Sequence, residues 1–237
     1  MPPRPSHPGE EGASLTTLLS IHLTCPVCGD QFDSRAAAAI VAIGQDTDFR
    51  RHYAGHDPLM YQVHACPSCR FCAFEGDFAE VTDQTREFVR SGRLLRTVPS
   101  AAVERDLSGS TKFLLAAACY EFDNRATVMR LADLYLRCSW CARSEGRRQR
   151  ETQCRIEAIL RFEKTLEDGE VEDGQRNTVL YLLGELYRRV GRFELAVALF
   201  DRALAEVEVE TEEGVISLLR RQREAAQMHE AENMTMS

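Results

Sequence analysis

Long apolar runs are missing from this sequence of 237 residues. No stretch approaches the roughly 20 consecutive apolar residues of a membrane-spanning helix, so we expect no membrane span. The start, Met1 to Ala13, is rich in Pro, Gly and Glu and lacks the apolar core of a secretory signal. Nine cysteines without such a signal fit a reducing compartment, and we therefore expect a cytoplasmic protein.

Common catalytic signatures are missing as well. The sequence has no glycine loop for phosphate, no nucleophile elbow and no pair of carboxylates at a familiar catalytic spacing. The net charge of −8 argues against a broad nucleic-acid-binding surface, because such a surface needs basic groups to replace counterions. With 44% hydrophobic and 28% charged residues, the composition is that of a globular protein with a real core. We expect that it is not an enzyme.

Two CPxC pairs near the amino end, Cys25 with Cys28 and Cys66 with Cys69, are the most informative motif that is present. A CxxC turn can direct both sulfurs at one ion about 2.3 Å away, and two such turns complete a tetrahedral shell with no place for water. A closed site of this kind is structural. We therefore predict a structural Zn²⁺ bound by these four cysteines, in a zinc-ribbon-like module whose hairpins fit between the two pairs.

The four thiols leave some alternatives open. Iron in a rubredoxin-like site uses the same ligands, and four reduced core cysteines would need no metal. Cys72 adds a third thiol to the second pair and is an alternative metal ligand, although its place between Phe71 and Phe74 favours a small buried residue. Gly29 follows the first pair and adopts a left-handed turn easily, whereas Arg70 holds the corresponding place in the second.

Other residues that could bind metal are interpreted structurally. Cys138 and Cys141 form another CxxC pair, but they lie on the apolar face of a predicted helix and are expected in the core. His52 and His56 are not expected to be ligands, because four cysteines already fill a tetrahedral site. His64 lies two residues before Cys66 and could donate a hydrogen bond that supports the metal site.

The second half of the sequence has a helical pattern. Residues 177–210 fit a tetratricopeptide-type (TPR-like) unit of 34 residues, in which Gly184 and Ala196 allow two helices to cross closely. A degenerate copy spans about 127–167. The sequence therefore predicts a mainly α protein, with a TPR-like helical repeat domain behind a small N-terminal zinc-ribbon-like β module.

The predicted organisation has five segments. They are a disordered N-terminus over 1–18, the zinc-ribbon-like module over 19–78, a linker helix over 79–107, the TPR-like helical domain over 108–232, and a frayed C-terminus over 233–237.

The order of these motifs is similar to that of a bacterial family. The chain has a CPVCG knuckle, then Tyr53-x-Gly55-x-x-Pro58-Leu59-x-Tyr61, then a CPxC knuckle followed by Ala73-Phe74-Glu75-x-Asp77-Phe78. This order resembles the proteins grouped as domain of unknown function 2225. The resemblance implies the same four cysteine ligands and a repeat-like helical half, and it implies no activity. The sequence departs from the family at Arg70, where Gly is usual, and at Cys72, where a small residue such as Ala is usual.

The leading functional hypothesis is a protein-interaction scaffold or adaptor whose concave helical face binds a protein or peptide segment. Tyr181, Arg188 and Arg192 are candidate groove residues, on the condition that this face is exposed. The alternative is a nucleic-acid-binding or transcription-associated zinc ribbon. Its phosphate contacts would come from Arg50, Arg51, His52 and Arg70. A zinc hydrolase or a redox protein is the remaining class.

Overall fold

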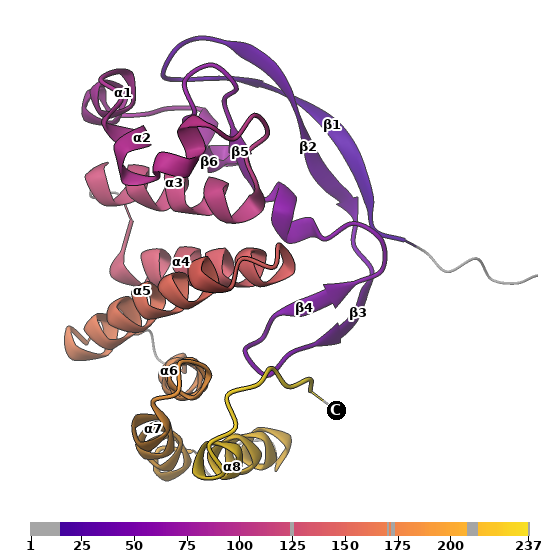
Figure 1. Cartoon of the computed structure of the whole chain (residues 1–237), viewed down its shortest axis with the longest axis vertical. Helices are drawn as coiled ribbons and strands as arrows, with labels where there is room; N and C mark the ends of the chain where they lie inside the picture. The colour runs from indigo at the N-terminus through magenta and orange to yellow at the C-terminus, as the bar shows by residue number, and fades with distance from the viewer. Residues whose placement is uncertain (1–14, 124–125, 170, 172–173, 208–212, 237) are drawn as a thin grey trace, which may run out of the picture.

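The structure is a computed structural model that describes residues 15–123, 126–169, 171, 174–207 and 213–236. Helices make up most of these residues, and three small antiparallel sheets of two strands each lie in the first third of the chain. Figure 1 shows the sheets along one side of a stack of helices. The prediction of a mainly α protein with a small N-terminal β module is confirmed at this level.

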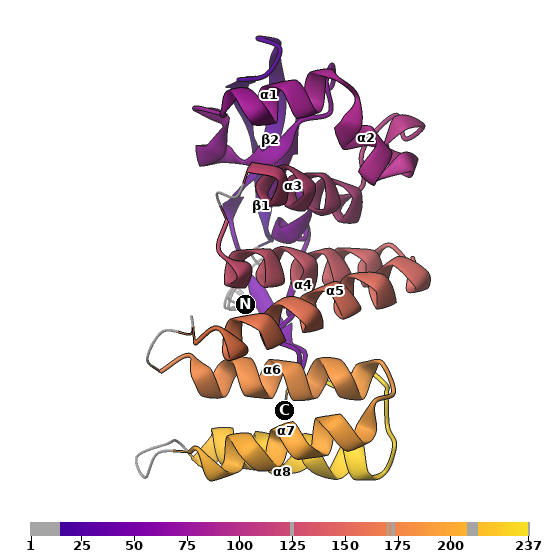
Figure 2. The same cartoon turned by 90° about the vertical axis from the view of Figure 1, so that its left-hand side faces the viewer.

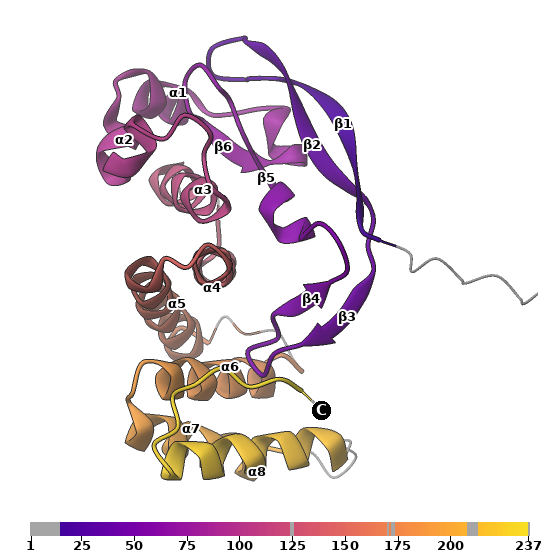
Figure 3. The ribbon, with the colours of Figure 1, turned by 45° about the vertical axis from the view of Figure 1, so that its right-hand side comes forward.

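The β module consists of three hairpins in sequence order. They are β1 (Thr17–Thr24) with β2 (Gln31–Ala39), β3 (Ala42–Gln45) with β4 (Arg51–Tyr53), and β5 (Val63–Ala65) with β6 (Cys72–Phe74). A short 3₁₀ helix, η1 (Pro58–Tyr61), precedes β5, and its N-cap Asp57 accepts a hydrogen bond from the Leu59 amide. The β3–β4 hairpin points toward the C-terminal helices (Figure 3).

The N-terminal prediction needs a correction. Thr16 forms a β-bridge with Gly55, and β1 begins at Thr17, so residues 16–18 are ordered by pairing instead of being disordered. The rest of that prediction, over residues 1–14, lies outside the described residues.

The predicted single linker helix is also wrong. This region contains η2 (Glu75–Phe78), α1 (Asp83–Arg90), α2 (Arg93–Thr97) and η3 (Pro99–Ala102). Gly92 separates α1 from α2 with a φ of 72°, a left-handed conformation that ends a helix and that glycine adopts without a Cβ clash. Pro99 then starts the final 3₁₀ turn, since its fixed φ suits a first helical position.

In the part of the chain that the structure describes, six longer helices form a stack, which Figure 2 shows. They are α3 (Gly109–Asp123), α4 (Val128–Ser144), α5 (Arg148–Glu167), α6 (Arg176–Arg189), α7 (Phe193–Ala205) and α8 (Glu213–Gln227). The close crossing expected at Gly184 is confirmed, because a Cβ atom there would lie 2.8 Å from Cε1 of Phe200 on α7. None of the described helices is long and apolar enough to cross a bilayer.

One continuous core joins the β module to the helices. It runs from Leu23 on β1 through Phe71 and Phe78 near the second knuckle to Leu180 and Ala226 in the last helices. Each large apolar side chain buried in this way contributes about 1.5 to 3 kcal/mol relative to exposure. The β module is therefore packed against the helical stack as part of the same hydrophobic unit.

The C-terminal tail is docked, which corrects the prediction that it frays. The Thr47 amide donates to the Met234 carbonyl at 2.8 Å, and the Met236 amide donates to the Gln45 carbonyl at 2.8 Å. Thr235 forms an antiparallel bridge with Asp46. Residues 233–236 thus lie against the tip of the β3–β4 hairpin, between it and the helices (Figure 3).

Candidate metal centre

The first knuckle is the turn that joins β1 to β2. The Cys25 amide donates to the Asp30 carbonyl, and the Gly29 amide donates back to the Cys25 carbonyl, each at 2.8 Å. Gly29 has a φ of 79°, the left-handed conformation expected from the sequence. These bonds fold residues 25–28 into a tight turn at the end of a hairpin.

The second knuckle repeats this geometry between β5 and β6. The Cys66 amide donates to the Phe71 carbonyl at 2.9 Å, and the Arg70 amide donates to the Cys66 carbonyl at 3.0 Å. Arg70 has a φ of 63°, so it adopts the conformation of Gly29 despite its side chain, at a cost of about 1 to 2 kcal/mol. Its guanidinium donates to the carbonyls of Glu104 and Arg105 at 3.0 and 3.3 Å, and these bonds offset the strain.

The two knuckles bring their four sulfurs together. The Sγ atoms of Cys25, Cys28, Cys66 and Cys69 all lie within 4.8 Å of one another. Cys25 Sγ is 3.5 Å from Cys69 Sγ, and Cys28 Sγ is 3.6 Å from Cys66 Sγ. A tetrahedron with metal–sulfur bonds of 2.3 Å has edges of roughly 3.8 Å. The cluster therefore has the size and donor set of a four-thiolate site and could hold a metal ion.

The electrostatics of the cluster favour a cation. A hydrogen bond from Cys69 lowers the pKa of the Cys25 thiol, and the same bond raises the pKa of Cys69. Burial raises the pKa of Cys66 to about 11. The sulfurs are too close for all four to ionise near neutral pH without compensation, and a divalent cation at their centre would supply it.

Contacts from other elements fix the two knuckles relative to each other. Ser68 Oγ donates to Asp30 Oδ2 at 2.6 Å, which joins one knuckle to the other. Arg90 of α1 donates to the Val27 carbonyl at 2.6 Å. His64 bonds the Ser34 hydroxyl at 2.9 Å through Nδ1, so it supports the β module through Ser34 and not through a cysteine.

The remaining cysteines lie in the core. Cys72 on β6 is buried outside the four-sulfur cluster, and burial raises its pKa well above the usual value. Cys138 and Cys141 are also fully buried, as expected for α4. The sulfur of Cys138 lies against the sulfur of Cys154 on α5. The sequence pattern did not reveal this contact, because it shows only that each cysteine lies on an apolar helix face.

The expected groove at Tyr181 and Arg188 is not open, and this prediction is wrong. The Tyr181 hydroxyl donates to the Thr47 carbonyl at 2.6 Å, and the Phe49 ring stacks on it with centroids 5.1 Å apart. Arg188 has 0% side-chain exposure and bonds both Glu185 oxygens, at 2.8 and 2.7 Å. The hairpin tip and the C-terminal tail cover this face of α6. Arg192 remains exposed at the turn before α7.

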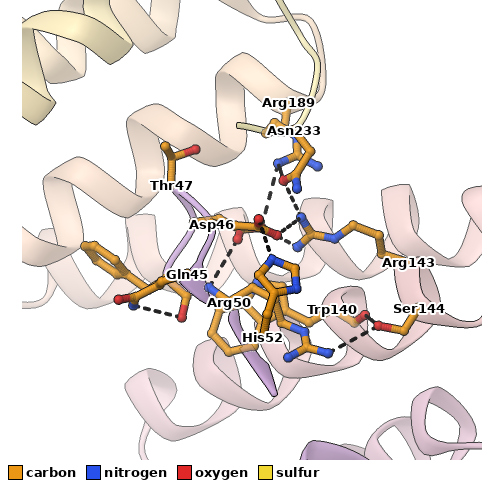
Figure 4. A network of polar contacts seen from close by, with 12 residues as sticks. Gln45, Asp46, Thr47, Arg50, His52, Trp140, Arg143, Ser144, Arg189 and Asn233 are labelled. Atoms are coloured by element: carbon orange, nitrogen blue, oxygen red, sulfur yellow. Dashed lines mark hydrogen bonds and ion pairs between the residues drawn. The ribbon is translucent and has the colours of Figure 1, made fainter. Parts of the chain in front are cut away.

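A partly buried polar network that sequence reasoning missed holds the hairpin tip in place (Figure 4). Arg143 of α4 reaches Asp46 at 3.1 Å and Asp48 at 2.5 Å, and both aspartate side chains are 1% exposed. Asn233 of the tail accepts hydrogen bonds from Arg143 and Arg189. The network thus ties one hairpin, two helices and the tail together. In the sequence, the aspartates at alternating positions 46 and 48 are what could have indicated this network.

The basic residues proposed for phosphate contacts are mostly engaged within the chain. Arg50 is buried and paired with Asp57, and His52 bonds Asp46 Oδ1 at 2.7 Å. Arg70 donates to the two carbonyls named above. Of these four residues, Arg51 is exposed. These residues do not form a free basic surface beside the cysteines.

The fold and the site define a helical protein whose N-terminal β module carries a four-cysteine cluster. Residues 18–226 match the family described as "Uncharacterized protein conserved in bacteria (DUF2225)", and the chain belongs to this family. The resemblance found in the motif order is thereby confirmed. An "Uncharacterized protein" of Borreliella burgdorferi is 22% identical over 139 residues, which cover 50% of each chain, so the match spans about half the length of this relative. No solved structure matches the chain.

Proposed function

We propose that this protein is a non-enzymatic, cytoplasmic scaffold or adaptor in which a structural Zn²⁺ stabilises the β module. The observation that carries the metal assignment is the four-sulfur cluster, whose four donors leave no position for a reacting water. The cluster would staple two hairpins that share few hydrogen bonds with each other. Zinc bound in this way contributes folding free energy directly.

The helical stack supports the interaction part of the proposal. The α6–α7 pair, with Gly184 against Phe200 and with Ala196 and Ala203 buried, has the small-residue crossing of a TPR-like unit. Such stacks bind partners through extended surfaces. Because the chain itself covers α6 near Arg188, the partner surface must lie elsewhere.

Exposed apolar side chains on α5 offer such a surface. Ile156 and Leu160, one helical turn apart, are 45% and 53% exposed, and Leu195 at the start of α7 is 49% exposed. Both helices lie on the side of the stack away from the β1–β2 ribbon (Figure 1). A side of this kind fits a protein partner that buries apolar side chains.

The interaction is tested by affinity purification with quantitative mass spectrometry from the native bacterium. Ile156→Glu and Leu160→Glu should each lower recovery of the specific partner at least about tenfold, since each buries a charge at the contact. Val103→Glu is the matched control, because Val103 is 85% exposed and lies in the linker region. Equal recovery with all three variants would contradict a partner surface on α5.

Metal identity separates this proposal from a rubredoxin-like redox protein. Zinc gives a colourless protein, whereas a rubredoxin-like iron site absorbs visible light through thiolate charge transfer. Elemental analysis and an absorption spectrum of the purified protein decide between them. A zinc hydrolase would need one open position on the metal. If the protein is such a hydrolase, the Cys28→Ser variant should stay folded, keep its metal and show a changed hydrolytic activity. If the site is structural, the same variant should lose its metal and its folded β module.

A further inference from the structure

A pocket of about 280 Å³ lies between the β3–β4 hairpin, η1 and α4. We call it the arginine pocket. Its walls combine three aromatic side chains with three arginines, which are Phe49, Tyr53, Trp140, Arg50, Arg51 and Arg137. No aspartate or glutamate is among the described residues that line it. The four-cysteine cluster uses none of these side chains, so the pocket is a separate feature of the molecule.

Two of the three arginines are already paired with acids. Arg50 is buried and forms an ion pair with Asp57. Arg137 donates through Nε to Asp133 Oδ2 at 2.7 Å and through Nη1 to Gln62 Oε1 at 2.8 Å. These contacts balance both charges and hold the Arg137 guanidinium in one orientation. Its Nη2 has no acceptor in the part of the chain that the structure describes, so it can still donate to a ligand.

Arg51 supplies a charge that no acid balances. The residue is exposed at the start of β4, and among the described residues its guanidinium has no ion pair or hydrogen bond. The arginines of the pocket and the acids paired with them therefore leave one net positive charge. One carboxylate complements it, because its two oxygens match the paired donors of a guanidinium. A phosphate monoester carries nearly two charges at neutral pH and is a poorer match.

The aromatic walls indicate that the carboxylate is attached to a ring. Phe49, Tyr53 and Trp140 are each partly exposed, so a flat ligand would cover ring surface that the chain leaves in contact with water. Aromatic side chains make favourable offset and edge contacts with another ring. Since a cavity of about 150 Å³ accommodates benzene, a pocket of nearly twice that volume accommodates one or two fused rings.

We propose that the arginine pocket binds a small aromatic carboxylate. The carboxylate pairs with Arg51 and with Nη2 of Arg137, and the ring packs against Tyr53 and Trp140. A ligand site that combines apolar walls with a few placed charged groups is typical of small-molecule pockets. The site is independent of the metal and of the partner surface on α5, so it can fail its test while both of these stand.

Naphthalene-2-carboxylate and naphthalene-2-carboxamide are matched probes, because they share shape and size and only the first carries a charge. Each is titrated into the full chain, with the indole N–H NMR signal of Trp140, the only tryptophan, as the reporter. The carboxylate should shift this signal saturably and bind at least about tenfold more tightly than the carboxamide, because charge-assisted hydrogen bonds are the stronger ones. No saturable shift with the carboxylate, or equal affinities of the two probes, would overturn the proposal.

A third probe, 2-naphthyl phosphate, tests the assignment of a single charge. It should bind no more tightly than the carboxylate at neutral pH, because only one charge of the pocket is unbalanced. Tighter binding of the phosphate would overturn the carboxylate as the class of ligand.

Two variants locate the binding. Arg51→Gln should lower the affinity for the carboxylate about tenfold and change that for the carboxamide less than twofold, because it removes the charge and keeps the ring contacts. Tyr53→Ala should weaken both probes by similar factors, because it removes a wall that both rings contact. Unchanged affinity for the carboxylate in both variants would place the ligand elsewhere and refute the proposal.

Arg96→Gln is the matched control for the charge. Arg96 is exposed on α2 and does not line the pocket, so this variant should bind both probes as the wild type does. Circular dichroism checks that each variant is folded as the wild type is. Equal losses of carboxylate affinity in Arg51→Gln and Arg96→Gln would reveal a general attraction to positive charge and refute the site.

Discussion

The ion pair between Arg188 and Glu185 within α6 gives a quantitative test of how the tail and hairpin are held. Both side chains have 0% exposure, and two hydrogen bonds of 2.8 and 2.7 Å join them. Arg188 also donates to the carbonyls of Glu230 and Glu232 in the tail. Arg188→Met would leave the Glu185 carboxylate buried without its main partner. Breaking a buried pair on one side costs about 3 to 5 kcal/mol, and we expect the free energy of unfolding to fall by that amount.

The double variant Glu185→Leu/Arg188→Met should be more stable than the single variant. It leaves no stranded charge, and replacing a buried pair by apolar residues is often close to neutral. The loss that remains comes from the Thr47 hydroxyl and two tail carbonyls, which forfeit bonds of about 1 kcal/mol each. We therefore expect the double variant to recover up to about 2 kcal/mol of the loss.

Urea unfolding measures these differences, with circular dichroism and the fluorescence of Trp140, the only tryptophan, as two probes. Arg202→Met is the control, since Arg202 and Glu206 form an exposed pair at 2.9 Å whose loss should cost less than about 1 kcal/mol. A single variant that loses as little as this control would refute the claim that the tail and hairpin bury the pair. A double variant less stable than the single one would refute the argument about the stranded charge.

Two further predictions use matched pairs of substitutions. Gly184→Ala should lower the free energy of unfolding by about 1 to 3 kcal/mol in urea titrations, because the new Cβ would clash with Phe200. Gly214→Ala is the control and should raise the free energy of unfolding by roughly 0.5 to 1 kcal/mol, because no atom lies near the position of its Cβ. Equal effects of the two substitutions would contradict the close crossing of α6 and α7. Met236→Pro should increase proteolysis of the tail and hydrogen exchange at the hairpin, because it removes the amide that donates to Gln45. Thr235→Pro is the control, and its proteolysis and hydrogen exchange should stay close to those of the wild type. Equal increases in both variants would refute the pairing of the tail with the hairpin.

The knuckles could be predicted because their chemistry is local. A CxxC turn needs only four adjacent residues, and the two copies specify each other through one ion. Arg70 shows the limit of this reasoning, since glycine is the usual residue for a φ of 63°. Its strain is offset by bonds to Glu104 and Arg105, which lie more than 30 positions away in the sequence.

The covering of α6 could not be predicted, because a helix pattern shows which side is apolar and not what lies on it. Tyr181 and Arg188 have polar groups that suggest an exposed face. Their partners are Thr47 and the tail, and nothing near them in the sequence indicates these contacts. The sequence of the tail is short and has no pattern of its own, so it predicts a frayed end. The tail is ordered because its backbone pairs with the β3–β4 hairpin.

The central claim is that Cys25, Cys28, Cys66 and Cys69 form one structural metal site. The most direct measurement is metal content per chain by elemental analysis, with circular dichroism on the same samples, for wild type, Cys69→Ala and Cys72→Ala. One zinc per chain in wild type and Cys72→Ala, and loss of both zinc and folded β structure in Cys69→Ala, is the predicted result. A Cys69→Ala protein that stays folded with a full zinc content, or a wild-type protein that is folded and metal-free, would contradict the claim.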